Sequence, residues 1–142
     1  MNIRPVLICA AALLGGCSTT ETPSNNAPLE NTYWKLMTLG GDDVKSPDGA
    51  REIQFMLNAE NHRLAGFSGC NNMMGAYTVE QNKIAFSNMG GTRMFCENTM
   101  DIEKRVHEMF SNATAWKISG KSLELIDSNG RPVATFESRD GK

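Results

Sequence analysis

The chain has 142 residues, with 14 Lys+Arg against 16 Asp+Glu, so its formal net charge at pH 7 is -2. This length allows one domain, and the balanced charge argues against a protein that binds the phosphate backbone of nucleic acids through a basic face. No apolar run reaches the roughly 18–20 residues that a membrane-spanning helix needs.

The first sixteen residues have the organisation of a secretory signal. Arg4 gives a short, positively charged start, residues 5–14 are apolar, and two small glycines precede Cys17. The order Leu-Gly-Gly-Cys resembles the lipobox of bacterial lipoproteins, in which the cysteine thiol is diacylglycerylated, the signal is cut before it and the new amine is acylated. We therefore predict a signal peptide at 1–16 and lipidation of Cys17. An ordinary secretory signal with an incidental cysteine is the alternative.

Residues 17–30 are predicted to form a lipidated, flexible tether. Residues 18–30 are polar and contain two prolines, a composition that cannot bury enough apolar surface to fold. Several acyl chains exceed the two signals that stable anchoring requires, so the membrane is the first expected partner. Ser18 follows the cysteine, and in the sorting pattern of Gram-negative lipoproteins a serine there implies the outer membrane, with the domain facing the periplasm.

Alternating apolar and polar residues predict about eight short strands from residue 31 onward. The predicted strands are 33–39, 52–57, 63–67, 77–79, 83–86, 115–118, 123–126 and 133–136. Residues 40–49 are predicted to be a loop, and the strands 52–57 and 63–67 to form a hairpin. The pair Asn129-Gly130 is a strong hairpin-turn signal between the last two strands.

One helix is predicted from Asn98 or Thr99, both good capping residues, to about Asn112. Its apolar stripe, at spacings i, i+4, i+7 and i+8, consists of Ile102, Val106, Met109 and Phe110. Its polar face is predicted to hold Glu103, Lys104, Arg105 and Glu108. The whole pattern predicts an α+β, mainly β domain at 31–137, in which the helix closes one side of a curled antiparallel sheet or partly open barrel. Residues 138–142 would be a C-terminal tail.

Two cysteines remain in the mature domain, Cys70 and Cys96. Two thiols in an exported, oxidising compartment most often pair, so we predict a disulfide between them. A redox pair is usually Cys-x-x-Cys, and zinc needs a cluster such as Cys-x-x-Cys or His-x-x-x-His. The two cysteines do not have the first spacing, and His62 and His107 lie far apart, so a redox or metal site is the weaker alternative.

Three motifs resemble the META domain family. Residues 31–36 are similar to its opening Thr-x-Trp-x-Leu strand, residues 66–77 to its Gly-x-x-Gly-Cys-Asn-x-x-x-Gly-x-Tyr signature, and residues 92–96 to its Thr-x-Met-Ala-Cys segment. Phe95 stands where the family usually has alanine. The resemblance covers residues 31–137. The matching residues, beside the two cysteines, are Trp34, Gly66, Gly69, Asn71, Gly75, Tyr77, Thr92 and Met94.

The resemblance implies a β-rich fold with a single helix, similar to the cracked barrel of secretion pilotins. Bacterial members include the HslJ-like heat-shock proteins, many of them envelope lipoproteins, and they are linked to heat response and novobiocin tolerance. The family brings no established catalytic residues. For the matching residues we predict structural roles, with turns at Gly69 and Gly75, bonds from Asn71 to loop backbone groups, and Trp34 and Tyr77 in the core or at its rim. A functional surface around this loop is the alternative.

These features predict a non-enzymatic envelope protein, a monomer without a cofactor, that acts in stress protection or assembly by binding a protein partner. A carrier or sensor of an apolar ligand such as lipid is one alternative, and it needs a cavity of some 300 Å³ or more. Copper binding is another, because thioethers suit Cu(I), although methionine also fills irregular cores. The methionines concerned are Met73, Met74, Met89 and Met94.

An enzyme is the least supported reading of the sequence. Ser68 does not lie in a Gly-x-Ser-x-Gly elbow, and His62 and Asp101 have no spacing that implies a triad. Asp42-Asp43 more simply marks a turn than a pair of acid and base carboxylates. The chain also has no phosphate-binding loop and no dinucleotide motif.

Overall fold

The computed structural model of the chain describes residues 25–46 and 48–139; the predicted signal peptide and Cys17 lie outside them. Within these ranges, nine strands form one sheet and one helix, α1 (Met100–Asn112), packs against it. The strands are β1 (Tyr33–Leu39), β2 (Asp42–Asp43), β3 (Gln54–Asn58), β4 (Arg63–Phe67), β5 (Asn72–Glu80), β6 (Lys83–Gly91), β7 (Ala113–Ser119), β8 (Ser122–Asp127) and β9 (Pro132–Arg139). The predicted α+β, mainly β class is confirmed.

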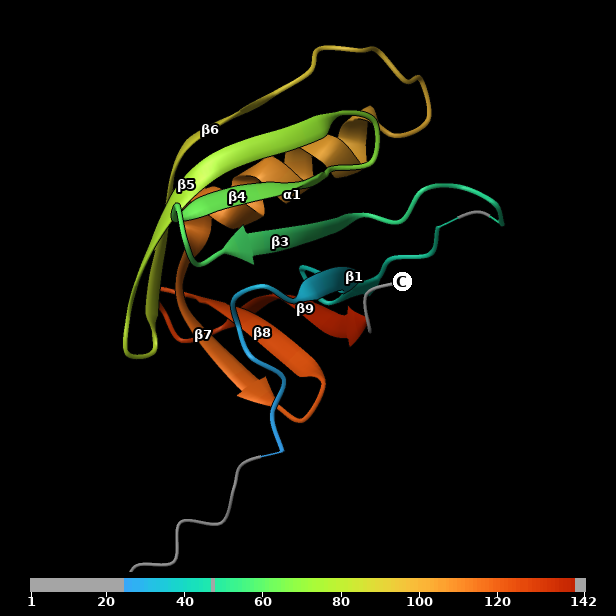
Figure 1. Ribbon diagram of the computed structural model, residues 1–142. Helices are drawn as coiled ribbons and strands as arrows, with labels where there is room; N and C mark the ends of the chain where they lie inside the picture. The colour runs from blue at the N-terminus through green and yellow to red at the C-terminus, as the bar shows by residue number, and fades with distance from the viewer. Residues whose placement is uncertain (1–24, 47, 140–142) are drawn as a thin grey trace, which may run out of the picture.

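The antiparallel sheet curls until its first and last long strands meet. The strand order is β2-β1-β3-β4-β5-β6-β7-β8-β9, and β1 also pairs with β9. Two of the junctions between neighbouring strands are short among the described residues: β1 pairs with β3 at two positions, and β6 pairs with β7 only at Lys83–Ala115. The sheet is therefore weakly joined at these two places. Figure 1 shows the result as two halves: β3 to β6 lie beside α1 in the upper half of the view, and β7, β8, β9 and β1 lie below.

Aromatic rings fill the space between the sheet and α1. The ring of Phe55 on β3 makes edge contacts with Phe110 of α1 and Phe136 of β9, at centroid distances of 5.4 and 4.9 Å. Trp34 on β1 is fully buried, and its Nε1 donates a hydrogen bond of 2.8 Å to the carbonyl oxygen of Leu29. Burial of each such side chain contributes roughly 1.5–3 kcal/mol, so these rings join both halves of the sheet to the helix.

The helix begins and ends where the sequence predicts, with Thr99 as its N-cap residue, although the Thr99 side chain makes no capping hydrogen bond. Val106, Met109 and Phe110 are buried as expected. Glu103, predicted on the polar face, is buried too, with 8% of its surface exposed. The prediction that Glu103 lies on the polar face is therefore wrong. Glu103 is buried because a set of hydrogen-bond donors, described below, binds its carboxylate. Among the described residues, no helix has the length and apolar character to cross a membrane.

The segment before residue 31 contacts the domain, although the sequence assigned it to the tether. The backbone N–H of Ala27 donates to Gly120 O at 2.8 Å, and Leu29 is buried. Tyr77 Oη donates to Glu30 Oε1 at 2.5 Å. Burial raises the pKa of the Tyr77 hydroxyl, and the neighbouring Glu30 carboxylate raises it further. The apolar residues of this segment explain why it packs.

The glycine-rich part of the chain is more regular than predicted. β5 begins at Asn72 rather than near residue 77, and β6 continues to Gly91. A Cβ atom added to Gly75 would lie 2.3 Å from Met89 Sδ, and one on Gly66 would lie 2.3 Å from Gln54 O. The predicted turn at Gly75 is therefore wrong. Both glycines lie inside strands and allow neighbouring atoms to approach closely.

Candidate functional site

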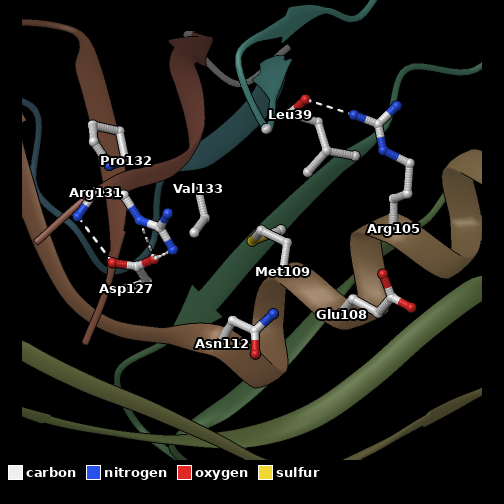
Figure 2. Close-up of a pocket in the computed structure, with 10 residues that line it drawn as sticks. Leu39, Arg105, Glu108, Met109, Asn112, Asp127, Arg131, Pro132 and Val133 are labelled. Carbon is white, nitrogen blue, oxygen red and sulfur yellow. Dashed lines mark hydrogen bonds and ion pairs between the residues drawn. The ribbon is translucent and has the colours of Figure 1, made fainter. Parts of the chain in front are cut away.

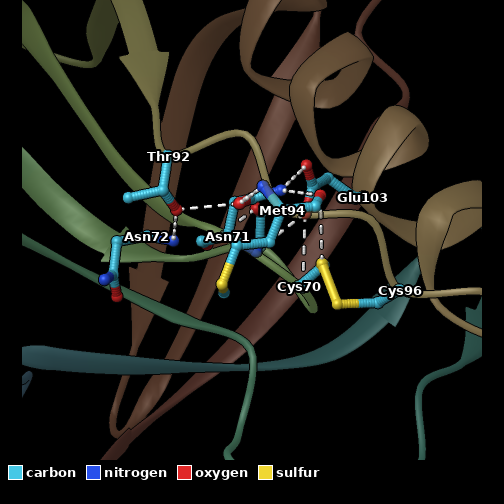
Figure 3. Close-up of a disulfide and its surroundings, with 8 residues drawn as sticks. Cys70, Asn71, Asn72, Thr92, Met94, Cys96 and Glu103 are labelled. Carbon is cyan, nitrogen blue, oxygen red and sulfur yellow. Dashed lines mark hydrogen bonds between the residues drawn. A yellow bond between two sulfur atoms is a disulfide. The ribbon is translucent and has the colours of Figure 1, made fainter.

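Helix α1 carries a carboxylate into the interior, where the segment 68–71 surrounds it with donors (Figure 3). Glu103 Oε2 accepts hydrogen bonds from the backbone N–H groups of Cys70 and Asn71, at 3.2 and 2.9 Å. Ser68 Oγ lies 3.1 Å from the same oxygen, and Asn71 Nδ2 donates to Oε1 at 2.8 Å. None of these donors is charged. Because two of them are successive backbone N–H groups, the site resembles the concave anion-binding sites that such groups form.

These donors determine the ionisation of the carboxyl group. Burial alone would raise the pKa of Glu103, but the hydrogen bonds from Asn71, Ser68 and Cys70 outweigh it and lower the pKa below its ordinary value of 4.5. An ionised carboxylate only accepts hydrogen bonds, which suits a site made of donors. Glu103 is therefore a buried carboxylate at neutral pH.

Gly69 gives the segment its shape. Its φ of +116° lies in a region that other residues rarely adopt, and an added Cβ would lie 3.2 Å from Ile102 Cγ2. This conformation turns the following two backbone N–H groups toward the helix. Gly69, for which the sequence predicts a turn, has the positive φ of a turn residue, and it thereby positions the two N–H groups that bind the carboxylate.

Asn71 connects the buried carboxylate to the loop between β6 and α1. Its Oδ1 accepts hydrogen bonds from Met94 N at 2.7 Å and Thr92 Oγ1 at 2.8 Å. Its Nδ2 donates to Met94 O at 3.0 Å as well as to Glu103. Both amide hydrogens and both oxygen lone pairs are used, so the side chain pairs with the backbone of Met94 much as a neighbouring strand would. Asn71 does satisfy loop backbone groups, and it does so across 23 residues.

The disulfide holds the same loop at a second point. Cys70 and Cys96 are bonded, with their Cα atoms 5.8 Å apart, which confirms the predicted pair. At the first attachment point and directly after it, the loop exposes two large apolar side chains: Met94 is 57% and Phe95 79% exposed. Figure 1 shows this loop extending beyond the sheet and α1. A rigidly attached loop therefore presents apolar surface to solvent.

We expect the stability that Glu103 contributes to be lost in acid. Because its folded pKa lies below the unfolded value, the contribution is fully present above about pH 4.5 and declines as the pH falls through the folded pKa. Urea titrations should show a smaller difference in unfolding free energy between wild type and Glu103→Gln at about pH 3.5 than at about pH 7. The Asp127 pKa, lowered chiefly by the backbone N–H of Arg131, affects both proteins equally. A difference that stays constant or grows in acid would contradict the assignment.

A surface pocket of about 390 Å³ lies between the end of β1, the C-terminal part of α1 and the β8–β9 turn (Figure 2). Met109 and Val133 are among the apolar side chains that line it. Both arginines at its border are held by carboxylates: Arg105 by Asp42 at 2.8 Å, and Arg131 by Asp127 at 3.0 Å. The volume is that of a small-molecule site. The positive and negative side chains that line the pocket balance each other, so they indicate no class of ligand.

The structure separates residues that the sequence analysis weighed together as possible metal ligands or catalytic groups. Met73 is buried and Met74 is 52% exposed, because they point to opposite faces of β5. Ser68 is fully buried and bonds to Glu103, whereas His62 packs its ring against Tyr77. Among residues 25–46 and 48–139, no three His, Cys, Asp or Glu side chains gather as possible metal ligands.

Glu103 is the residue that sequence reasoning missed. It lies three residues before Val106 and seven before Phe110, which are both buried, so helical spacing places all three on one face. That spacing was the available signal, and the charge of the side chain argued against it. The donors that make its burial possible lie more than thirty residues earlier in the chain.

The comparisons with known proteins agree with this architecture. The META domain matches residues 27–140. A solved NMR structure of a protein from Burkholderia xenovorans is similar, with 24% identity and a TM-score of 0.64 over 99% of this chain and 100% of that chain. A second NMR structure has 19% identity and a TM-score of 0.61, over 77% of this chain and 90% of that chain. These likenesses show the fold. No curated protein matches the sequence.

Proposed function

Because the chain belongs to the META domain family, we propose that it is an envelope protein that acts by binding a protein partner, without catalysis, in stress protection or assembly. One observation carries the proposal: Met94 and Phe95 are exposed on a loop that the disulfide and Asn71 hold in place. Aromatic side chains often contribute most of the binding energy at protein interfaces. A loop that is already ordered loses little further entropy on binding.

Photo-crosslinking at position 95 tests this proposal. We expect a photoreactive phenylalanine analogue at Phe95, in the exported full chain, to give a reproducible protein adduct. The same analogue at Asn129, in the exposed β8–β9 turn, is the matched control and should give none. Phe95→Ser should change the unfolding free energy by no more than about 0.5 kcal/mol, because the side chain is largely in solvent. Equal adducts at both positions, or none at 95, would refute binding through this loop.

We further propose that Cys17 carries the lipid and that the outer membrane is the location of the protein. This rests on the lipobox-like order before Cys17 and on Ser18 after it. Cys17→Ala should move the protein from the membrane fraction to the soluble fraction of the envelope. Cys9→Ala, which changes the other cysteine of the same region, should leave it membrane-bound. Membrane association that survives Cys17→Ala would refute the anchor.

A further inference from the structure

The outward face of β3, β4 and β5 carries a row of apolar and small residues. The strand register places Met56 beside Ala65, Ala65 beside Met74, and Met74 beside Gly90 of β6. All four are exposed, with Met56 at 39% and Met74 at 52%. At the usual strand spacing the row is about 14 Å long. It lies on the face of the sheet that does not contain Phe55 and the aromatic core.

From Gly90, at the end of this row, the chain runs into the exposed loop after β6. Asn72 lies two residues before Met74 and so shares its face of β5. Its backbone N–H donates to Thr92 Oγ1, and the backbone N–H of Thr92 donates to Asn72 O, each at 3.1 Å. Met94 and Phe95 follow Thr92 after one residue, Arg93. We call this set of exposed residues the methionine surface; it consists of Met56, Ala65, Met74, Gly90, Met94 and Phe95.

Arginines border the methionine surface, although the whole chain has a net charge of -2. Arg63 occupies the neighbouring row on β4, and Arg93 precedes Met94. The Arg51 guanidinium lies 4.3 Å from the centroid of the Phe67 ring, on the same face. None of the outward-facing strand residues of β3, β4 and β5 between residues 54 and 76 is acidic. The acidic residue of the loop, Glu97, lies beyond the disulfide.

We propose that the methionine surface docks a partner-protein segment whose apolar side chains are flanked by aspartate or glutamate; this rests on the proposed function. Methionine side chains are flexible and adapt to the shape of an apolar partner. The bordering arginines are placed to pair with carboxylates and to attract them at long range.

An anionic lipid surface offers similar chemistry, but the path of the chain favours a protein. The Gly120 backbone N–H donates to Asn26 Oδ1 at 2.7 Å, so the described chain begins beside the β7–β8 turn. Figure 1 shows this turn and the loop after β6 at opposite ends of the molecule. The loop is therefore at the end of the domain remote from the point at which the described chain begins, and this placement favours a protein partner over the membrane of the proposed anchor.

The test uses the exported full chain with a photoreactive phenylalanine analogue at Met74, the centre of the row. Adducts are identified by mass spectrometry in three backgrounds: wild type, Arg63→Glu with Arg93→Glu, and Lys104→Glu with Lys117→Glu. The last pair changes the net charge equally, at exposed positions of α1 and β7. Melting temperatures of all three verify folding. We expect an adduct on an acidic, apolar protein segment whose yield falls about tenfold in the arginine variant alone.

Every other outcome overturns the assignment. An adduct on lipid would make the surface membrane-directed, and an adduct on a neutral or basic segment would remove the carboxylate partner. An equal fall in both charge variants would show that only net charge matters. An adduct at position 95 without one at 74 would leave the proposed function intact and refute the extended surface. No adduct at either position would refute both.

Discussion

Glu103→Ala should lower the free energy of unfolding by about 3–5 kcal/mol. The change removes the acceptor of two buried backbone N–H groups, those of Cys70 and Asn71. Each buried donor without a partner costs about 1–3 kcal/mol, and the cavity adds to this. The melting temperature should fall by about 10–20 °C, as measured by circular dichroism or calorimetry. That loss is a large part of the 5–15 kcal/mol that is typical of a domain.

A second glutamate on the same helix provides the control. Glu108 has a side chain that is 57% exposed, so Glu108→Ala should stay within about 0.5 kcal/mol of wild type. Glu103→Gln should lie between the two, because one amide oxygen can still accept from the backbone but the amide nitrogen cannot. If Glu103→Ala and Glu108→Ala are equally stable, the buried carboxylate does not have the structural role assigned to it.

The same substitution should reach the exposed loop. Glu103 binds Nδ2 of Asn71, and the Asn71 amide binds the backbone of Met94 on both sides. Loss of the carboxylate therefore removes one of the bonds that orient this amide. Faster hydrogen exchange at the Met94 N–H would follow in Glu103→Ala. A buried polar group on α1 thus supports the position of an apolar side chain in solvent.

The elements that follow local periodicity could be predicted from the sequence. The helix stripe at Val106 and Phe110 and the alternation in β3 and β4 each depend on residues close in the chain. The disulfide followed from a compartment argument and a count of two cysteines. Glu103 shares the spacing of the buried stripe, but its charge argued for solvent, and its burial depends on backbone donors contributed by a distant segment of the chain. A charged residue in a helix is normally solvated, and only those donors reverse the preference.

Glycine caused the main errors in the strands. Gly69 has the positive φ of a turn residue, whereas Gly75 lies inside β5 and makes room for Met89. Both uses depend on the missing side chain, and sequence alone does not distinguish them. The exposure of Phe95 could not be predicted from the sequence either, because an apolar residue is normally expected in the core. Its exposure depends on the disulfide and the Asn71 amide, which hold the loop away from the core.

Replacing both cysteines, Cys70→Ser with Cys96→Ser, should cost about 3.5 kcal/mol of unfolding free energy. The bond joins residues 26 positions apart, and it restricts the unfolded chain more than it restricts the folded one. The fold itself should persist, because the Asn71 amide still holds Met94. The part of the loop beyond Met94 then loses its second attachment point. Crosslinking from position 95 should therefore fall even at temperatures at which the domain remains folded.

Reduction of the wild type distinguishes the bond from the serine side chains. A thiol reductant should lower the melting temperature of the wild type toward that of the double variant and leave the variant unchanged. The crosslinking yield at position 95 should fall in the same comparison, because binding through a held loop depends on the bond and not on the residues that make it. A reduced wild type that melts and crosslinks like the oxidised one would show that the disulfide neither stabilises the domain nor positions Phe95. The rigid presentation of apolar surface would then have to come from the Asn71 amide alone.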